Sequence, residues 1–547
     1  MKAVGEDGTV CKDTRESHGK FKTSWGTEIR PFYGSDDAKV SQGSKLGNPG
    51  EYPFRRGVYP EMYRKRLWTK RFLTGHQSVE EFNIRQKAII ASGSTGISFV
   101  PCSNSYMRGY DSDMVEKELV GVTGTPVDSI IDAEIAFGGI KLDKISCAFN
   151  TPNPHVLIAM CFVLAQNQGI DLKHIQGTSN QADFISHWLS CQQMIRFPLN
   201  AHLRCMIDHV KFCNKYVPNW HPLSIIGQHM SEGGATAVQE MAFAFSTGKF
   251  YIKELVKAGL EVDEFAPRLS FFFNVRSQFF EEIAKFRAAR IIWAKIMKEE
   301  FKAENPKSWL MKFHAQTSGV ELAANEAENN IVRSAYHSLA AVFGGVQSLH
   351  TDSYDEALWT PTPEAQRLAV MTQNIIAEET DVPSVVDPLG GSYFIEALTN
   401  DIEEKIWEEI AQIDDMGGIF EAVKTGHVQK KIMQSAVDRQ SALEAGERTW
   451  VGVNKYVLDK EKEKHPPQIK VDSDYIDMQI ERTKRIKRER SQDEAKKALS
   501  SLRKMAQTGE GNIFEGVMNA AKASVTNGEI INELREVFGF GRPDIFY

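Results

Sequence analysis

Short apolar runs alternate with longer segments of helical spacing over most of the first 350 residues. The runs lie at 97–100, 145–149, 222–226, 270–273 and 310–313. Nearly continuous apolar runs of this length are typical of parallel strands that are buried on both faces. Between them, residues 277–301 place Phe279, Ile283, Phe286, Trp293 and Met297 at spacings of three, four or seven, as one stripe of a helix does. The number of strand–helix units predicts an α/β fold, and a (β/α)8 TIM barrel rather than an open sheet.

The pattern of polar and apolar residues is different before and after this region. Residues 1–51 are polar and predict an extended N-terminal arm. The alternation stops at the turn-rich segment 386–392, and a helix capped by Asn400 or Asp401 is predicted to carry Ile402, Ile406, Ile410 and Ile413 on one face. A charge-rich helix is predicted over 472–507, with the basic run 482–488 as a solvated face. We therefore expect an arm at 1–51, a barrel at 52–395 and a helical region at 396–547.

Composition narrows the class of protein. The chain has 547 residues, 42% of them hydrophobic and 25% charged, which is typical of globular proteins. A net charge of −7 does not favour a nucleic-acid partner, and no apolar run is long enough for a membrane span. Seven cysteines without a C-x-x-C pair, together with a charged start that lacks a signal sequence, indicate reduced thiols in a cytoplasmic protein.

Common catalytic motifs are missing, but polar residues accompany the predicted strands. The sequence contains no Walker A loop, G-x-S-x-G or H-E-x-x-H motif, and no histidine pair beside carboxylates indicates a metal bound by the protein. The polar residues are His229, Arg268, Ser270, His314, Gln316, Gln347 and His350. Because the carboxyl ends of barrel strands meet at one face, we expect these side chains to converge on one cavity there.

Several long runs resemble one enzyme family. They are YPFRRGVYPEMYRKRLWTKR (52–71), RGYDSD (108–113), DEFAPRLSFFF (263–273), KFRAARIIWAKIM (285–297), FHAQTSGVEL (313–322), GGVQSLHTDSYDEAL (344–358) and VDPLGGSYFIEALT (386–399). Over 52–547 the chain resembles the large subunit of the adenosylcobalamin-dependent acyl-CoA mutases, the methylmalonyl-CoA mutase family. The resemblance implies an isomerase whose barrel threads an acyl-CoA along its axis, while adenosylcobalamin supplies the radical for a carbon-skeleton rearrangement.

The resemblance also implies roles for individual residues. The predicted catalytic residues are His229, which matches the family histidine that hydrogen-bonds the thioester carbonyl, and Gln192, which takes the place of the family arginine that pairs with a free carboxylate. The predicted acyl-CoA-binding residues are Tyr59, Arg66, Arg71, Leu73, Ser98, Val100, Thr178, Asn180, Arg268 and Ser270. The residues predicted to face the cofactor are Glu232, Gln316, Gln347 and Glu356.

Departures from the family pattern concern the acyl group. Leu73 stands where the methylmalonyl enzymes have a tyrosine, Gln192 where they have the arginine that pairs with a second carboxylate, and Val100 where the hydroxyacyl enzymes have an aspartate. Leu73 with Gln192 resembles the isobutyryl-CoA and 2-hydroxyisobutyryl-CoA mutases, which predicts a short branched acyl-CoA without a second carboxylate. Two alternatives stay open: a methylmalonyl- or alkylsuccinyl-CoA mutase that uses Arg196 or Arg204, and a non-catalytic barrel that binds CoA esters.

The D-x-H-x-x-G signature of the family's cobalamin-binding module does not occur in this sequence. We therefore expect a separate small subunit to bind most of the cobalamin, in a hetero-oligomer of two large and two small subunits.

Overall fold

The computed structural model describes residues 22–28, 37, 46–75, 77–458 and 470–541. Ten strand segments form two five-stranded parallel sheets with the orders β1-β10-β9-β8-β7 and β2-β3-β4-β5-β6. The segments are β1 (Thr69–Arg71), β2 (Leu73–Thr74), β3 (Gly96–Phe99), β4 (Ser146–Phe149), β5 (Gly177–Ser179), β6 (Trp220–His221), β7 (Leu223–Ile226), β8 (Leu269–Val275), β9 (Phe313–Thr317) and β10 (Ser348–His350).

The two sheets close into one barrel. Only Phe72 separates β1 from β2, and only Pro222 separates β6 from β7, so each pair is one strand with an interruption. Within each pair, one half bonds to the neighbour on one side and the other half to the neighbour on the opposite side, because β1 pairs with β10 and β2 with β3, while β6 pairs with β5 and β7 with β8. Eight strands in chain order therefore surround one axis, which confirms the predicted TIM barrel.

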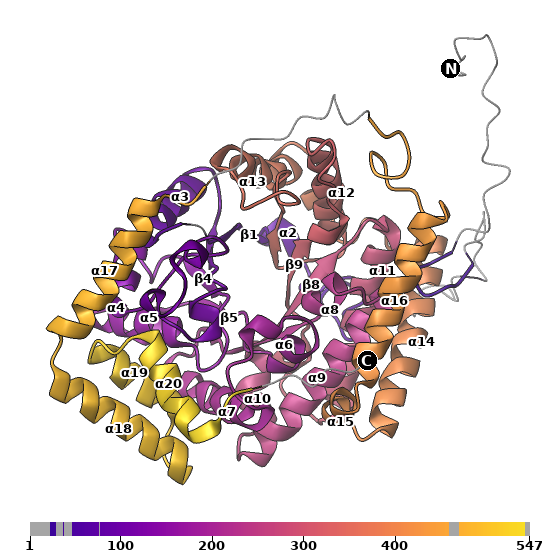
Figure 1. Ribbon diagram of the computed structural model, residues 1–547. Coiled ribbons are helices and arrows are strands. Elements are labelled where there is room, and N and C mark those ends of the chain that lie inside the picture. The colour runs from indigo at the N-terminus through magenta and orange to yellow at the C-terminus, as the bar shows by residue number, and fades with distance from the viewer. Residues whose placement is uncertain (1–21, 29–36, 38–45, 76, 459–469, 542–547) are drawn as a thin grey trace.

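A helix follows every strand and covers the outside of the barrel, as Figure 1 shows in a view along its axis. These helices are α3 (Val79–Ala91), α4 (Ile130–Ala136), α5 (Val156–Asn167), α6 (Phe184–Ser190), α7 (Leu199–Tyr216), α8 (Gln228–Glu232), α9 (Ala237–Lys257), α10 (Val262–Phe265), α11 (Phe279–Lys295), α12 (Asn329–Phe343) and α13 (Pro363–Glu378). A short helix, α2 (Met62–Lys65), precedes the first strand.

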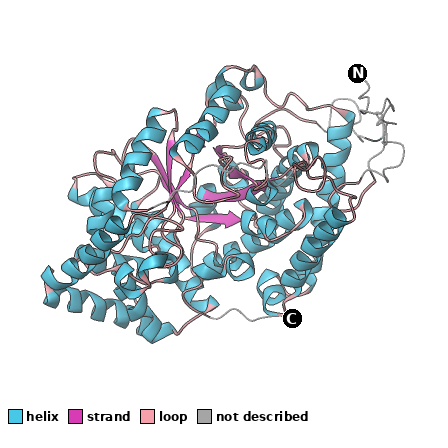
Figure 2. Cartoon of the chain, turned by 45° about the horizontal axis from the view of Figure 1, so that its top comes forward, coloured by secondary structure: helices cyan, strands magenta, loops and turns pink. Residues whose placement is uncertain are grey.

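Seven further helices cover two separate sides of the barrel. They are α14 (Tyr393–Asp415), α15 (Ile419–Lys424), α16 (His427–Glu444), α17 (Ser473–Glu489), α18 (Gln492–Thr508), α19 (Ile513–Lys522) and α20 (Asn527–Phe538). Helix α14 packs on α9 and α11, whereas α19 packs on α5 and α7. Figure 2 shows the resulting continuous layer of helices around the central strands. None of the described helices is both long and apolar enough to span a bilayer.

Helix α11 has apolar and charged residues buried on nearly every side, not on one stripe as predicted. The cause is α14, whose own apolar face carries Ile402, Ile406, Ile410 and Ile413, all buried. That face is predicted correctly, but its helix starts at Tyr393, so Asn400 and Asp401 lie inside it and are not its cap. The sequence pattern indicates the apolar stripe of each helix separately. It cannot show that α14 covers the outer side of α11.

Two other predicted elements have different limits. The strand expected at 310–313 is Phe313–Thr317, because Pro306–Trp309 is a 3-10 turn and the strand alternates polar His314 and Gln316 with buried residues. The single helix expected at 472–507 is broken at Ser491, whose side chain caps α18 by accepting from the Glu494 amide.

The solvated face expected at 482–488 is wrong in part. Arg482 is buried and bonds Asp132 of α4 at 3.0 Å, and Lys487 bonds Asp113 at 2.7 Å. The basic run therefore fastens α17 to the barrel. Much of the predicted arm at 1–51 lies outside the described residues.

Candidate active site

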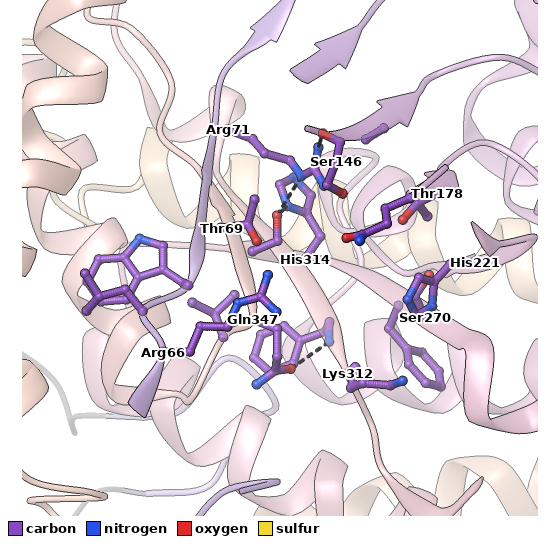
Figure 3. A pocket seen from close by; sticks show the side chains of 18 of the residues that line it. Arg66, Thr69, Arg71, Ser146, Thr178, His221, Ser270, Lys312, His314 and Gln347 are labelled. Atoms are coloured by element: carbon purple, nitrogen blue, oxygen red, sulfur yellow. Dashed lines mark hydrogen bonds between the residues drawn. The ribbon is translucent and has the colours of Figure 1, made fainter. Parts of the chain in front are cut away.

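A cavity of about 600 Å³ enters the barrel at the end where the strands begin. Its lining includes Thr69, Ser146, Gly177, His221, Ser270, Lys312 and Gln347, which start strands or directly precede or follow such positions. Figure 3 shows the side chains of this set other than Gly177 around the cavity, on separate strands or next to them. Ser270, His314 and Gln347 thus lie near the amino ends, and the expectation that all the polar residues converge at the carboxyl ends is wrong. Placing the strand at 310–313 put His314 after its strand, whereas it is the second residue of β9.

Cations gather at the mouth of this cavity. Lys65 and Arg66 come from the segment that leads into β1, next to Tyr59, which is 43% exposed. Lys312 lies on the opposite side, where its Nζ donates to the carbonyl of Pro267 at 2.6 Å. Burial, with the nearby charges of Lys307 and Arg268, lowers the pKa of Lys312 to about 8. Cations held in this way can bind phosphate groups at the entrance.

Arg268 lies behind the wall of the cavity and is not part of its lining. Its guanidinium donates to Asn214 and to the carbonyl of Glu264 at 2.7 Å, and its own carbonyl oxygen is 2.9 Å from Nδ1 of His221. His221 does line the cavity. In this structure Arg268 therefore positions His221 and adds positive charge near the entrance.

Arg71 brings a buried guanidinium to the middle of the cavity. Its nitrogens donate to the carbonyls of Ile97 and Ser146 and to the hydroxyls of Ser146 and Ser348, at 2.6–3.1 Å. No carboxylate is among these partners, and burial lowers the pKa of Arg71 to about 10. The four hydrogen bonds fix the group in place, so that it can orient a neutral polar ligand that passes along the axis.

Polar side chains form a chain across the next three strands. Asn180 Nδ2 donates to Asn150 Oδ1 at 2.8 Å, and Asn150 Nδ2 donates to Ser98 Oγ at 3.2 Å. Strand register places Leu73 opposite Ser98, and the adjacent pairings continue through Ala148 to Thr178. The structure thus brings Leu73, Ser98, Thr178 and Asn180 to one region of the wall. Val100 directly follows β3 beside them and packs with an apolar cluster.

His229 lies at the opposite end of the barrel from the cavity mouth, in α8 directly after β7. Its Nδ1 is 3.3 Å from Ser186 Oγ. Burial lowers the pKa of His229 to about 4, so the ring is neutral at pH 7. A neutral imidazole can donate one hydrogen bond to a carbonyl without bringing a charge into an apolar site.

An acidic cluster surrounds the carboxyl ends of β8, β9 and β10. Glu232 accepts from Asn274 at 2.6 Å, from Ser318 at 2.9 Å and from the Val320 amide at 3.0 Å. Asp352 accepts from Gln316 at 3.0 Å. Gln316, Glu232 and Glu356 therefore lie near one another, whereas Gln347 lies at the cavity mouth, where its Oε1 accepts from the Phe313 amide at 3.0 Å.

The end of β10 adds His350 to this cluster. His350, Asp352 and Glu356 bring one ligand atom each to within 4.8 Å of one another, a grouping with metal-binding geometry that the sequence did not indicate. Burial raises the pKa of Glu356 to about 8, and that of Asp352 well above its usual value. Asp352 Oδ2 is buried without a hydrogen-bond partner among the described residues. Such acceptors fit a ligand that donates hydroxyl groups.

Gln192 is exposed in the structure and does not line the cavity. Arg196, four residues on, is fully buried and donates to the carbonyls of Tyr106 and Met107. Arg204 donates to Asp208 and to the Gly511 carbonyl, both at 2.8 Å. Both arginines that could replace the family arginine are thus engaged in holding the fold.

Sequence reasoning missed several polar lining residues, among them Lys65, Ser146, Lys312 and Ser348. Lys312 carried a signal, because a lysine in an apolar run of a buried strand needs a polar environment. The serines carried none, since serine is common in strands and loops alike.

The fold and the site together define an α/β-barrel protein with a cavity that enters along the barrel axis. The sequence model of the family "Methylmalonyl-CoA mutase" matches residues 22–540. The large subunit of 2-hydroxyisobutanoyl-CoA mutase from Aquincola tertiaricarbonis is 38% identical over 98% of this chain and 95% of its own length. The methylmalonyl-CoA mutases of Rhizobium meliloti (39%) and Homo sapiens (40%) each match 95% of this chain, over 72% and 68% of their own lengths.

The chain belongs to the methylmalonyl-CoA mutase family. Members of this family are cobalamin-dependent acyl-CoA mutases, and the chain is an isomerase of that type.

Proposed function

We propose that the chain is the barrel subunit of an adenosylcobalamin-dependent mutase for a short branched acyl-CoA that lacks a second carboxylate. The observation that carries this proposal is that the arginines of this region already bond to groups of the protein. Arg196 and Arg204 are held by protein groups, and Arg71 already makes four hydrogen bonds to protein oxygens. A second carboxylate in this wall would lack a charged partner, which costs several kcal/mol, about the penalty for an unpaired buried charge.

The relatives support the same substrate class. The large subunit from Aquincola tertiaricarbonis is named for 2-hydroxyisobutanoyl-CoA, a branched acyl group with one carboxyl carbon. Leu73 and Val100 present apolar groups beside the Ser98–Asn150–Asn180 chain. We infer an isobutyryl-like acyl group, with the CoA phosphates near Lys65, Arg66 and Lys312 at the mouth and the thioester toward His229.

We place the cofactor at the carboxyl ends of the strands, where hydrogen-bond acceptors gather. Adenosylcobalamin supplies the radical that starts the rearrangement when it is bound. The chain's own contribution is to present Glu232, Gln316, Asp352 and Glu356 as acceptors and to exclude water. We propose that a separate small subunit holds most of the cobalamin, against a barrel that comprises residues 52–395 and the helices that follow.

The partner proposal predicts weak cofactor binding by the chain alone. Titration calorimetry should give a Kd above the micromolar range for adenosylcobalamin with the isolated chain, and much tighter binding once a cobalamin-binding small subunit is added. Micromolar or tighter binding by the chain alone would contradict it.

The substrate proposal is tested with isobutyryl-, 2-hydroxyisobutyryl- and methylmalonyl-CoA, assayed with adenosylcobalamin and the small subunit. We expect kcat/KM for isobutyryl-CoA to exceed that for methylmalonyl-CoA by about thirtyfold to several thousandfold, the effect of a missing charged partner. Equal values, or a preference for methylmalonyl-CoA, would mean that another cation serves the carboxylate.

A double variant tests the position of Gln192. Because Gln192 is exposed and does not line the axial cavity, Gln192→Arg with Leu73→Tyr should shift the preference toward methylmalonyl-CoA no further than a neighbouring exposed arginine does. Gln193→Arg with Leu73→Tyr is the matched control, because residue 193 is also exposed and the charge change is identical. If both pairs behave alike, Gln192 does not face the acyl group.

A further inference from the structure

A second cavity of about 460 Å³ lies outside the barrel axis. It is enclosed by α12, by α16 and by the segment at residues 448–451, and it borders residues that follow β8 and β9. Its charged lining consists of Arg333, Arg439, Arg448 and Glu321, and we refer to it as the arginine cavity. It is therefore near the carboxyl ends of the strands, away from the mouth of the axial cavity.

The arginine cavity has an excess of positive charge. Three guanidinium groups face one carboxylate, which leaves a net charge of +2 on its lining. Glu321 accepts from Arg439 at 2.9 Å and from Arg448 at 3.2 Å. Although burial opposes ionisation, Arg439 and Arg448 hold the pKa of Glu321 below its usual value. Glu321 is therefore charged, and one carboxylate still does not balance the arginines.

Donor groups remain available beside this pair. Nε of Arg439 is buried and has no hydrogen-bond partner among the described residues. Arg276 lies behind Glu321 with its Nε 4.0 Å from the carboxylate and likewise unpartnered within the described chain. Buried guanidinium groups with unmet donors are costly, and an anion in the cavity would offset the positive charge of Arg439 and of Arg276, which does not itself line the cavity.

The remaining lining indicates which anion fits. Tyr336 and Trp450 offer aromatic surface, while Ser277, Gln278 and Asn329 offer neutral polar groups. Guanidinium groups match phosphate oxygens in pairs, and aromatic side chains accept a ring or a sugar beside them. We propose that the arginine cavity binds the phosphate group of a phosphate ester, at a site distinct from the axial acyl-CoA cavity.

The site is connected to the cofactor-facing residues. Glu321 ends the 3-10 turn Gly319–Glu321, and the amide of Val320 in that turn donates to Glu232 at 3.0 Å. A bound phosphate would compete with Glu321 for Arg448 and so act on the turn that holds Glu232. The binding proposal itself does not depend on the substrate assigned above.

Calorimetric titration with inorganic pyrophosphate at constant ionic strength tests the proposal. We expect two sites in the wild type, one in the arginine cavity and one at the axial mouth, and at least about tenfold weaker binding in the arginine cavity for Arg448→Gln, because a paired guanidinium–phosphate contact is lost there. Arg448→Lys should bind with intermediate affinity. Arg488→Gln removes the same charge from a side chain that is 67% exposed, and should bind like the wild type. Lys312→Gln reports on the axial mouth and should leave binding in the arginine cavity unchanged.

Three results would overturn the proposal: no binding of pyrophosphate at millimolar concentration, equal binding by Arg448→Gln and the wild type, or a loss only in Lys312→Gln. Thermal melting of each variant verifies that it is folded. Titrations with ATP, CoA and cobalamin then separate the sources of the phosphate, since the first carries a terminal triphosphate and the last an internal diester.

Discussion

His229 combines a half-buried ring, a serine contact and a neutral charge state at pH 7. A group of this kind acts by donating a hydrogen bond to a carbonyl oxygen, so its loss should reduce turnover more than binding. We expect His229→Ala to lower kcat by about a hundredfold or more, the range for removing one such donor. The measurement is steady-state turnover with the partner subunit present.

The control for this variant is His174→Ala, which removes an exposed histidine. An unchanged kcat in His229→Ala would show that another group polarises the thioester. Because the pKa of His229 is about 4, its contribution should be constant above about pH 5 and should decline only toward pH 4.

At the scale of single residues, the sequence identified some of the side chains that line the cavity but not the directions or contacts of the residues next to them. Ser270 is in the cavity wall, as predicted, because its strand could be recognised, whereas Thr178 was placed there by the family resemblance alone. Arg268 and Gln192 are outside it, since Arg268 ends the 3-10 turn before β8 and Gln192 lies in the connection between α6 and α7. Lys312 was missed because the predicted strand began three residues too early, at residue 310 instead of Phe313.

At the scale of elements, α5 begins at a histidine in the left-handed backbone region. His155 has φ of 60°, and its Nδ1 is 2.8 Å from the carbonyl of Thr151. Burial lowers the pKa of His155 to about 3. The unfolded chain, with a pKa of about 6.5, binds more protons than the folded chain between these two values, so the stability due to this group falls as the pH drops below about 6.5.

His155→Asn should remove this dependence while keeping a residue that tolerates the left-handed conformation. We expect the free energy of unfolding to depend less on pH between about 4 and 6, by up to about 1.4 kcal/mol per pH unit. Denaturant unfolding at several pH values measures it. His174→Asn, at an exposed position, should leave the pH dependence unchanged.

The apolar runs predicted the strands with continuous burial, such as β3 and β7. The sequence did not indicate β1, β5 or β10, which have only three residues each and carry Arg71, Thr178 and His350 toward polar surroundings. Strands that direct polar side chains toward the cavity have the least apolar sequence pattern. Because strands are recognised by their apolar pattern, these are the ones that the sequence does not reveal.

At the scale of the whole molecule, the C-terminal helices are fastened to the barrel by buried polar groups. Arg482 bonds Asp132, and Thr483 bonds Asp128 at 2.6 Å. We expect Arg482→Met to lower the thermal transition by several degrees, because it leaves a buried carboxylate unpaired at a cost of about 3–5 kcal/mol. Calorimetry, with hydrogen exchange of α17, is the measurement.

Arg488→Met is the matched control, since its side chain is 67% exposed and its pair with Glu489 spans 3.5 Å. It should change stability by less than about 0.5 kcal/mol. Equal melting of Arg482→Met and the wild type would show that apolar packing alone holds α17 in place.

The two interrupted strands have a mechanical consequence. They are the first and the fifth of eight, so the breaks at Phe72 and Pro222 lie on opposite sides of the cylinder. Each half keeps an unbroken ladder, and the halves meet along two seams where one strand changes partners. We expect the two half-barrels to move apart along these seams. A ligand much longer than the cavity mouth could then enter from the side and be enclosed when the halves close again.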